Sequence, residues 1–405
     1  MNKKVKLVAS MLTVVMGVSA LWGCASSNNS KKNDDKEIVV WSNLMDNEVE
    51  AVNEIAQQWA KDNNKKVKVL KDNSGYQEFL QAANSAKGPD MLFGIAHNNL
   101  GTFQAAGLLE EVPSDFVNRD DYVGSNVWDA VSYDGKAYGV PISMETYALF
   151  YNKDIVSKLP ETMNELVEQA KAHGPSGFQF PINDFYYTAA FVQSYGGYVF
   201  GGGNGSLDVN NLGFNSEGSI KAYQYLQDLV QKDKFMVPDI TGDIANNSFK
   251  SGEAIFYIGG PWDVSGFKEA GVNFGITAIP KINGVPAKSF MGVQSAFVSS
   301  KSESKDDTWK LMKYLIENSG DKLYEVGNRI SVLKSELEKS EVANNDYTKG
   351  FIAQLKSAVP MPNVSETQAI WDGVKNIQRI LLGEDPKTVA EDIQRAVKDA
   401  IGVSK

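Results

Sequence analysis

The sequence predicts an α/β protein of two lobes, each a mixed, mostly parallel sheet flanked by helices, joined by several crossings of the chain. With 405 residues, the chain exceeds the size at which single hydrophobic cores usually stop growing, so two lobes are expected. Strand-like and helix-like patterns alternate over residues 37–96, which is typical of a parallel sheet. Residues 140–144 and 147–151 are two further apolar runs with the composition of buried strands.

Glu145 lies between those two apolar runs, where a charge is costly unless something pairs with it. One interpretation is a short loop with an exposed glutamate, which the usual exposure of glutamates favours slightly. The other is a strand that crosses between the lobes, with Glu145 facing the gap and a hydroxyl-bearing ligand. This stretch alone leaves both open.

The first lobe is predicted from strands at residues 37–41, 66–70 and 91–96, with helical patterns after the first two. Ligands of such sheets bind beyond the carboxyl ends of the strands. This rule nominates the polar residues that follow the first and third strands, namely Asn43, Asp46, His97, Asn98 and Asn99.

The second lobe offers an acid and a series of aromatic residues after predicted strands. Asp184 is followed by Phe185, Tyr186 and Tyr187, and Trp262 follows a Gly-Gly-Pro turn. Sugar rings stack their C–H faces on aromatic rings, and their hydroxyls donate to carboxylates. The alternative is that some of these rings form the buried face of a helix, which we expect for Phe185 and consider for Tyr187.

Two more segments are predicted to cross between the lobes, at residues 290–298 and 328–333. Several crossings make a broad, stiff hinge. The first lobe is then expected to comprise residues 37–143 and 291–331, and the second residues 144–290 and 332–405.

The amino terminus is predicted to be an export signal. Lysines precede an apolar stretch that ends at Leu21-Trp22-Gly23-Cys24, which resembles a bacterial lipobox. Residues 1–23 are then a signal peptide, Cys24 is the lipidated residue, and residues 24–36 are a polar, flexible tether. The alternative is plain secretion.

Composition excludes several classes of protein. The net charge of −10 argues against nucleic acid as a partner. Cys24 is the only cysteine, and the two histidines, His97 and His173, are far apart, so we expect no metal site and no Cys–His nucleophile. No cofactor is expected.

Motifs in the same order are similar to the maltose/maltodextrin-binding proteins, the extracytoplasmic solute-binding subunits of ABC sugar importers. The similar segments are residues 38–41, 88–90, 128–131, 140–154, 184–187, 194–198, 260–262, 292–296 and 361–363, with Trp371. The resemblance covers essentially the whole chain after the signal peptide. It implies a periplasmic-binding-protein-like fold whose lobes close over an oligosaccharide.

The resemblance also implies roles for residues. Glu145 matches the family's sugar carboxylate on the crossing strand, and Asp184 and Tyr186 match an acid and an aromatic residue of the second lobe. Trp262 and Trp371 match two stacking tryptophans. Asn98 and Asn99 stand where the family often has an Asp–Arg pair, and Asp46 is near a first-lobe acid. Together with Tyr187, these are the predicted ligand-binding residues.

Three departures from the family's pattern put the ligand's length and linkage in doubt. The charged Asp–Arg pair is replaced by the two amides of Asn98 and Asn99. Gly94 and Ile95 stand where a tryptophan is expected, and Ala189 stands at a position that can be aromatic.

The favoured function is a monomeric receptor that delivers malto-oligosaccharides to the transmembrane subunits of an ABC permease. No enzymatic activity is expected of it. It is expected on the outer face of a bacterial, Gram-positive-type membrane, held by its lipid anchor alone. The alternatives are the same receptor for another oligosaccharide, for example a β-linked one, a starch-adhesion module, and a glycoside hydrolase that uses Glu145 and Asp184.

Overall fold

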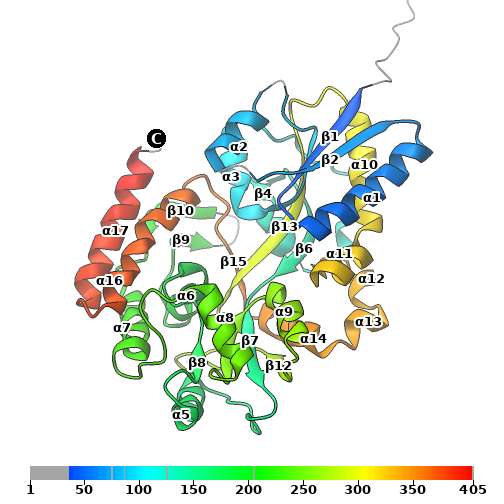
Figure 1. Ribbon diagram of the computed structural model, residues 1–405. Helices are drawn as coiled ribbons and strands as arrows, with labels where there is room; N and C mark the ends of the chain where they lie inside the picture. The colour runs from blue at the N-terminus through cyan, green and yellow to red at the C-terminus, as the bar shows by residue number, and fades with distance from the viewer. Residues whose placement is uncertain (1–35, 74–75, 86, 125, 204–205, 404–405) are drawn as a thin grey trace, which may run out of the picture. The chain divides into compact units, whose positions relative to one another are not determined.

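The computed structural model describes residues 36–73, 76–85, 87–124, 126–203 and 206–403 (Figure 1). The predicted signal peptide, Cys24 and all of the predicted tether except Lys36 lie outside the described residues. Within the described residues, no helix is both long enough and apolar enough to cross a membrane.

The first sheet has seven strands in the order β14-β6-β13-β3-β1-β2, with β15 also paired to β13. Its strands are β1 (Glu37–Ser42), β2 (Lys66–Lys71), β3 (Met91–Ala96), β6 (Val140–Glu145), β13 (Phe290–Val298), β14 (Ile330–Ser331) and β15 (Val359–Pro360). β1 is parallel to β2 and β3, whereas β13 is antiparallel to β3 and to β6. The predicted bounds of β3 and β13 are confirmed.

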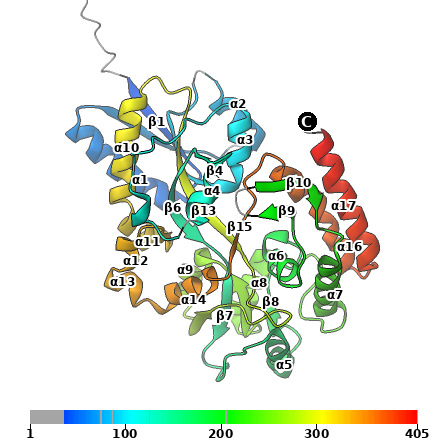
Figure 2. The same ribbon diagram turned by 180° about the vertical axis from the view of Figure 1, so that it is seen from behind.

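Helices and short 3₁₀ turns accompany this sheet. They are α1 (Asp46–Asp62), α2 (Tyr76–Ala83), η1 (His97–Asn99), α3 (Leu100–Ala105), η2 (Arg119–Asp121), α4 (Asn126–Ala130), α10 (Lys305–Asn318), α11 (Gly320–Gly327), α12 (Lys334–Leu337) and α13 (Ser340–Ala343). α1 buries Val52, Ala56 and Trp59 at helical spacing, which explains why this segment is a helix that packs on the sheet. α1 also packs beside α10 and α11 (Figure 2).

The second sheet has four strands in the order β12-β7-β11-β8. They are β7 (Ala148–Asn152), β8 (Phe178–Gln179), β11 (Phe256–Gly259) and β12 (Phe274–Thr277). Only β11 and β8 are parallel, because β7 enters from the first sheet and runs opposite to both of its neighbours. The expectation of mostly parallel sheets is therefore wrong for this sheet, and it is not met in the first sheet either, where the pairings of the described strands are three parallel and three antiparallel. The mixed two-lobed α/β class itself is confirmed, and the lobe boundaries given above stay a prediction.

A second group of helices accompanies this sheet. They are α5 (Met163–His173), α6 (Phe185–Ser194), α7 (Glu217–Gln231), α8 (Gly242–Ser251), η3 (Pro261–Asp263), α9 (Val264–Glu269), α14 (Asp346–Leu355), α15 (Thr367–Gly373), η4 (Val374–Asn376), α16 (Ile377–Leu381) and α17 (Pro386–Val403). α7, α16 and α17 lie side by side in both views (Figures 1 and 2). Two hairpins complete the fold, β4 (Ser132–Tyr133) with β5 (Lys136–Ala137), and β9 (Phe200–Gly203) with β10 (Ser206–Leu212).

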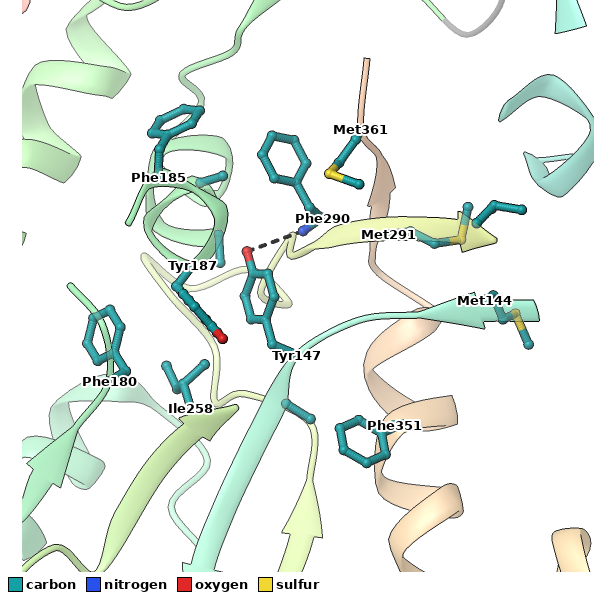
Figure 3. Close-up of a cluster of buried hydrophobic side chains, with 14 of the residues drawn as sticks. Met144, Tyr147, Phe180, Phe185, Tyr187, Ile258, Phe290, Met291, Phe351 and Met361 are labelled. Carbon is teal, nitrogen blue, oxygen red and sulfur yellow. Dashed lines mark hydrogen bonds between the residues drawn. The ribbon is translucent and has the colours of Figure 1, made fainter. Parts of the chain in front are cut away.

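The crossing segments between the sheets are joined by side chains as well as by the strand ladder. Between β6 and β7, the hydroxyl of Thr146 donates to the carbonyl oxygen of Phe290 at 2.7 Å and lies 2.7 Å from the hydroxyl of Ser289. The backbone N–H of Phe290 donates to the hydroxyl of Tyr147 at 3.2 Å (Figure 3). The crossings are thus fixed to one another where they leave the first sheet, as expected of a stiff hinge.

His97 is fully buried beside these crossings and has a defined tautomer. Its Nδ1 accepts from the backbone N–H of Val293 on β13, so Nε2 carries the proton and donates to the carbonyl oxygen of Met361, both at 3.0 Å. Burial outweighs these hydrogen bonds and lowers the pKa of His97 to about 4. The side chain is therefore a neutral structural link between β3, β13 and the segment after β15, and it is buried although its place after β3 nominated it as a ligand contact.

Candidate ligand-binding site

A cavity of about 170 Å³ lies where β6 ends, beside the start of α1, the turn from α11 to β14, and η3. It is lined by Met45, Asn47, Glu48, Met144, Glu145, Pro261, Trp262, Ser265, Val326, Gly327, Asn328, Arg329 and Ile330. Strands of the first sheet and the turn that follows β11 of the second therefore contribute, and two predicted site residues, Glu145 and Trp262, line the same cavity.

Trp262 forms one wall of the cavity. β11 ends at Gly259, Gly260 continues in an extended conformation, and Pro261 begins the short turn η3. A Cβ at position 260 would lie 2.2 Å from the indole ring, so glycine is needed for the ring to lie over this backbone. Trp262 is 45% exposed, which confirms that the turn projects it beyond the strand and out of the core.

The turn that carries Trp262 is held by the neighbouring carboxylate. Asp263 accepts from the backbone N–H of Gly260 at 3.1 Å, from the hydroxyl of Tyr257 at 3.1 Å, and from the amide of Asn246 at 2.9 Å. Burial outweighs these three donors and raises the pKa of Asp263 to about 6. The tryptophan is thus free on its ring face and fixed at its backbone.

Charged groups form another part of the lining, which we call the charged wall. Arg329 donates through Nε and Nη2 to the two carboxylate oxygens of Glu48, at 2.7 and 3.0 Å, and through Nη1 to Glu145. The amide of Gln294, on β13, donates to the other oxygen of Glu145 at 3.1 Å. Neither interpretation of Glu145 from sequence is complete, since the residue is neither an exposed loop glutamate nor an acid without a protein partner.

The predicted residues of α6 lie next to Trp262 but outside the described lining of the cavity. The ring of Tyr186 is 6.4 Å from that of Trp262 and 4.9 Å from that of Tyr147. Burial, and next the charge of Glu145, raise the pKa of Tyr186. Phe185 and Tyr187 are buried, as expected for the inner face of this helix.

Asp184 caps α6, since its carboxylate accepts from the backbone N–H of Tyr186 at 2.9 Å. Burial raises the pKa of Asp184 despite that hydrogen bond. Its local role is therefore to begin the helix that presents Tyr186.

The remaining predicted residues also lie outside the described lining of this cavity. Trp371 is partly buried on α15, with its ring 6.5 Å from that of Phe185. Asn98 and Asn99 lie in η1, and the Asn99 amide donates to the carbonyl oxygen of Ala96. Asp46, at the start of α1, is highly exposed and pairs with Lys71.

Sequence reasoning missed Glu48, Gln294 and Arg329 as site residues. One signal for Arg329 was present, because the chain contains 40 Lys and Arg residues of which only four are arginines. An arginine in a lysine-rich chain indicates a position that needs several directed hydrogen bonds. Glu48 gave no such signal, since it falls among the acidic residues that are usual in the first turn of a helix.

A larger hollow of about 770 Å³ lies elsewhere, lined by residues of α8, the start of β8 and the segment after α7, including Met236, Val237 and Ile244. Among its described lining residues there is neither a predicted site residue nor a charged wall facing an aromatic ring. We therefore take the smaller cavity as the site. The described residues also hold no group of three or more His, Cys, Asp or Glu side chains that suits a metal ion.

A protein-family model described as "Bacterial extracellular solute-binding protein" matches residues 54–349, which is more than half of the chain. The chain belongs to this family. It is therefore an extracellular solute-binding protein and not a glycoside hydrolase.

Relatives and solved structures place this solute-binding protein among receptors for oligosaccharides. It is 28% identical to a galactooligosaccharide-binding protein of Bacillus subtilis over 99% of this chain and 98% of that protein. It is 29% identical to a maltodextrin-binding protein of the same organism, over 98% and 95% of the two chains. The maltose-maltodextrin binding protein of Alicyclobacillus acidocaldarius has a TM-score of 0.82 and 36% identity, with 90% of this chain and all of that chain covered.

A maltotriose-binding protein of Thermus thermophilus, solved with maltotriose, has a TM-score of 0.79 and 29% identity over 90% of this chain and all of that chain. These likenesses confirm the two-lobed fold expected from the resemblance.

Proposed function

We propose that this solute-binding protein captures malto-oligosaccharides in the cavity between Trp262 and Glu145 and delivers them to an ABC importer. The observation that carries the proposal is the pairing of an exposed indole face with a fixed carboxylate across one cavity. A sugar ring stacks its C–H face on the indole, while hydroxyls at its rim donate to Glu145.

The arrangement of the cavity suggests how binding is linked to movement. Trp262 follows a strand of the second sheet, and Glu145 ends a strand of the first. A ligand that contacts both lobes stabilises the state in which they are close, so that affinity and closure share one free energy. We propose that longer ligands contact further residues as the lobes move. These are Tyr186 and Tyr187, which lie beside Trp262, and Asp46, Asn98, Asn99, Asp184 and Trp371.

Malto-oligosaccharides are the first choice of ligand because solved relatives were obtained with maltotriose and maltotetraose. A galacto-oligosaccharide is the second, supported by the relative in Bacillus subtilis that carries that name. Stacking on Trp262 alone does not distinguish them, because both present apolar ring faces.

Titration of intrinsic tryptophan fluorescence decides between the two ligands. Maltotriose, maltotetraose, a galacto-oligosaccharide and cellotetraose are added in turn to the protein without its signal peptide. A saturable change with the malto-oligosaccharides supports the first ligand, and a change with the galacto-oligosaccharide alone replaces it with the second. No response to any sugar, together with an unchanged melting temperature, contradicts oligosaccharide capture.

We also propose that Cys24 carries a lipid that anchors a monomeric receptor to the outer face of the cell membrane. The support is the run Leu21-Trp22-Gly23-Cys24 and the streptococcal relatives that are named lipoproteins. Metabolic labelling with a palmitate analogue tests it. The wild-type chain is expected in the labelled membrane fraction and the Cys24→Ser variant in the medium, and equal release of both contradicts the anchor.

A further inference from the structure

Arg329 lies between two carboxylates at the wall of the cavity. The side chain of Glu48 is 1% exposed, while those of Glu145 and Arg329 are each 15% exposed. All three line the cavity, but Glu48 is the buried end of this row of charges and Glu145 with Arg329 is the more exposed end. We call these three residues the charge clamp.

The geometry of the clamp requires an arginine. Arg329 uses one edge of its guanidinium for both oxygens of Glu48 and a further N–H for Glu145. The planar guanidinium offers five N–H groups in fixed directions, whereas an ammonium cannot hold two carboxylates in such a planar arrangement. Burial opposes the charge of Arg329, but the hydrogen bonds to Glu48 and the charges of both glutamates outweigh it and raise its pKa.

The surrounding backbone is shaped for this contact. A Cβ at Gly327 would lie 1.8 Å from a carboxylate oxygen of Glu48, so a larger residue cannot stand there without displacing the clamp. Asn328 then adopts a left-handed conformation, with φ of 52°, and ends α11. The amide of Asn47 donates to the carbonyl oxygen of Val326 at 2.8 Å and ties this turn to α1.

Glu48 is itself held by a second donor. The oxygen that accepts from Nη2 of Arg329 also accepts from the backbone N–H of Met45 at 2.8 Å. The clamp is therefore anchored at the start of α1, and its position at the cavity does not depend on a ligand.

We propose that Arg329 is a positioning residue that acts through Glu145, and that Glu48 fixes Arg329 in turn. Arg329 and Gln294 together set the orientation of the Glu145 carboxylate, so that its remaining lone pairs point into the cavity before a ligand arrives. Preorganised acceptors cost no reordering on binding, which is how a side chain that orients an acceptor raises affinity through it. This inference rests on the proposed function, because it requires a ligand rich in hydroxyl groups.

A double-mutant cycle tests the clamp, with maltotriose as the probe, or a galacto-oligosaccharide where the wild type binds only that. Arg329→Met, Glu145→Gln and their combination are titrated beside the wild type, and each melting temperature is measured without ligand. We expect each single variant to bind about 10- to 100-fold more weakly, and the double variant within about 3-fold of the weaker single variant. Arg329→Lys is expected to fall between the wild type and Arg329→Met.

Arg379 supplies the matched control. It also holds two carboxylates, those of Glu384 and Asp392, but it lies on α16, away from the lining of the cavity. Arg379→Met is expected to change the melting temperature and to leave the affinity at the wild-type value. This contrast separates a loss of positioning from a general loss of stability.

The outcomes distinguish the clamp from the proposed function. A wild type that binds the probe while Arg329→Met binds equally well overturns the clamp alone. Effects of the two single variants that multiply in the double variant also overturn it, since Arg329 then acts independently of Glu145. A wild type that binds none of the sugars overturns both proposals.

The isosteric Glu48→Gln variant covers the case in which Arg329→Met does not fold. It keeps the shape of the clamp and weakens the hold on Arg329, so affinity is expected to fall by about 3- to 10-fold. An unchanged affinity of this folded variant overturns the clamp.

Discussion

The charged wall and the aromatic wall of the cavity differ in burial and in hydrogen bonding. On the charged wall, Glu145 and Arg329 are mostly buried and each makes more than one hydrogen bond to other side chains. On the aromatic wall, the ring of Trp262 is 45% exposed, although the turn beneath it is fixed by Asp263. The charged side chains are therefore hydrogen-bonded within the protein before a ligand binds, whereas the ring of Trp262 is left partly exposed.

The difference follows from the energetics of the two kinds of group. A charge that is removed from water without a partner costs several kcal/mol, so the charged wall has to be internally satisfied before binding. An exposed indole costs far less, and its area is removed from water only when a ligand stacks on it. The aromatic wall is thus expected to provide affinity, and the charged wall to provide orientation.

The largest expected effect is on the charged wall, from Gly327→Ala. The added methyl group would meet a carboxylate oxygen of Glu48 at 1.8 Å, so the Glu48–Arg329 contact must break or the turn must move. We expect the free energy of unfolding to fall by about 3 kcal/mol, the usual cost of breaking a buried ion pair. Urea denaturation measures it. Gly402→Ala is the control, because a Cβ there meets nothing within 4 Å, and a loss as small as that of the control would contradict the steric account.

The next effect is on the aromatic wall, from Trp262→Ala. Affinity for the bound oligosaccharide is expected to fall by about 2 kcal/mol, while the melting temperature without ligand stays within a few degrees, because the ring is largely exposed. Calorimetric titration and a melting curve measure the two quantities.

Trp309→Ala should show the reverse pattern. Trp309 packs on Phe116, with ring centroids 4.8 Å apart, and lies outside the cavity. We expect its loss to lower stability and to leave affinity unchanged. A Trp262→Ala variant that behaves like Trp309→Ala would show that the ring of Trp262 is structural.

The stability of the turn beneath Trp262 is expected to depend on pH, because Asp263 holds that turn. Asp263 has a pKa raised to about 6, so the folded state binds its proton more tightly than the unfolded state. Its contribution to stability is therefore largest below about pH 4 and falls as pH rises to 6, by about 3 kcal/mol in total. Hydrogen bonds from Tyr257 and Asn246 and the charge of Lys250 offset part of the rise that burial causes in the pKa of Asp263. Burial, and next the charge of Asp263, in turn raise the pKa of Tyr187.

Asp263→Asn removes that titration. Relative to the wild type, the variant should gain stability between pH 4 and pH 7.5, measured by urea denaturation at several pH values. His97 does not disturb the difference, because it acts equally in both proteins. With a pKa lowered to about 4, its contribution is complete above pH 6.5 and is lost as pH falls toward 4. A difference that does not vary with pH would show that Asp263 titrates normally.

The smallest effect is expected from Asp46→Ala. Asp46 is largely exposed and pairs with Lys71, and such surface pairs contribute about 0–1 kcal/mol to stability. Affinity should stay within about 3-fold of the wild type if the cavity alone defines the site. A loss above 10-fold would show that lobe movement brings Asp46 onto the ligand, and would restore its predicted role.

The sequence predicted those parts of the molecule that depend on local patterns. The strands at β3 and β13 follow from runs of buried apolar residues, and the exposure of Trp262 follows from a Gly-Gly-Pro turn after a strand. The direction of β7 relative to its neighbours was not predictable in this way. It is set by the chain entering the second sheet from the first, which is not a local pattern. β7 is buried along most of its length, so its continuous apolar run looks like that of a parallel strand although its neighbours are antiparallel.

The charged wall was only half predictable. The residues around Glu145 left both an exposed and a paired glutamate open, and its role at the site was implied by the similarity to the maltodextrin-binding proteins. Its partner, Arg329, is 184 residues away in sequence. Glu48 is further still from Arg329, at 281 residues. Local periodicity carries no information on such pairs, so only their chemistry, an arginine in a lysine-rich chain, gave a hint. The helical stretch from α15 to α16 is likewise divided after Gly373, where a Cβ would lie 2.3 Å from Val397 of α17, another distant contact.

The defined tautomer of His97 has a practical consequence. The chain contains only two histidines, so the imidazole region of an NMR spectrum holds two sets of signals. The Nε2 proton of His97 is buried and bonded to Met361, and it exchanges with solvent only when the contact between β3, β13 and the segment after β15 opens. The exchange rate of this proton, measured with and without sugar, therefore reports how often the hinge region opens, and no label has to be attached to the protein.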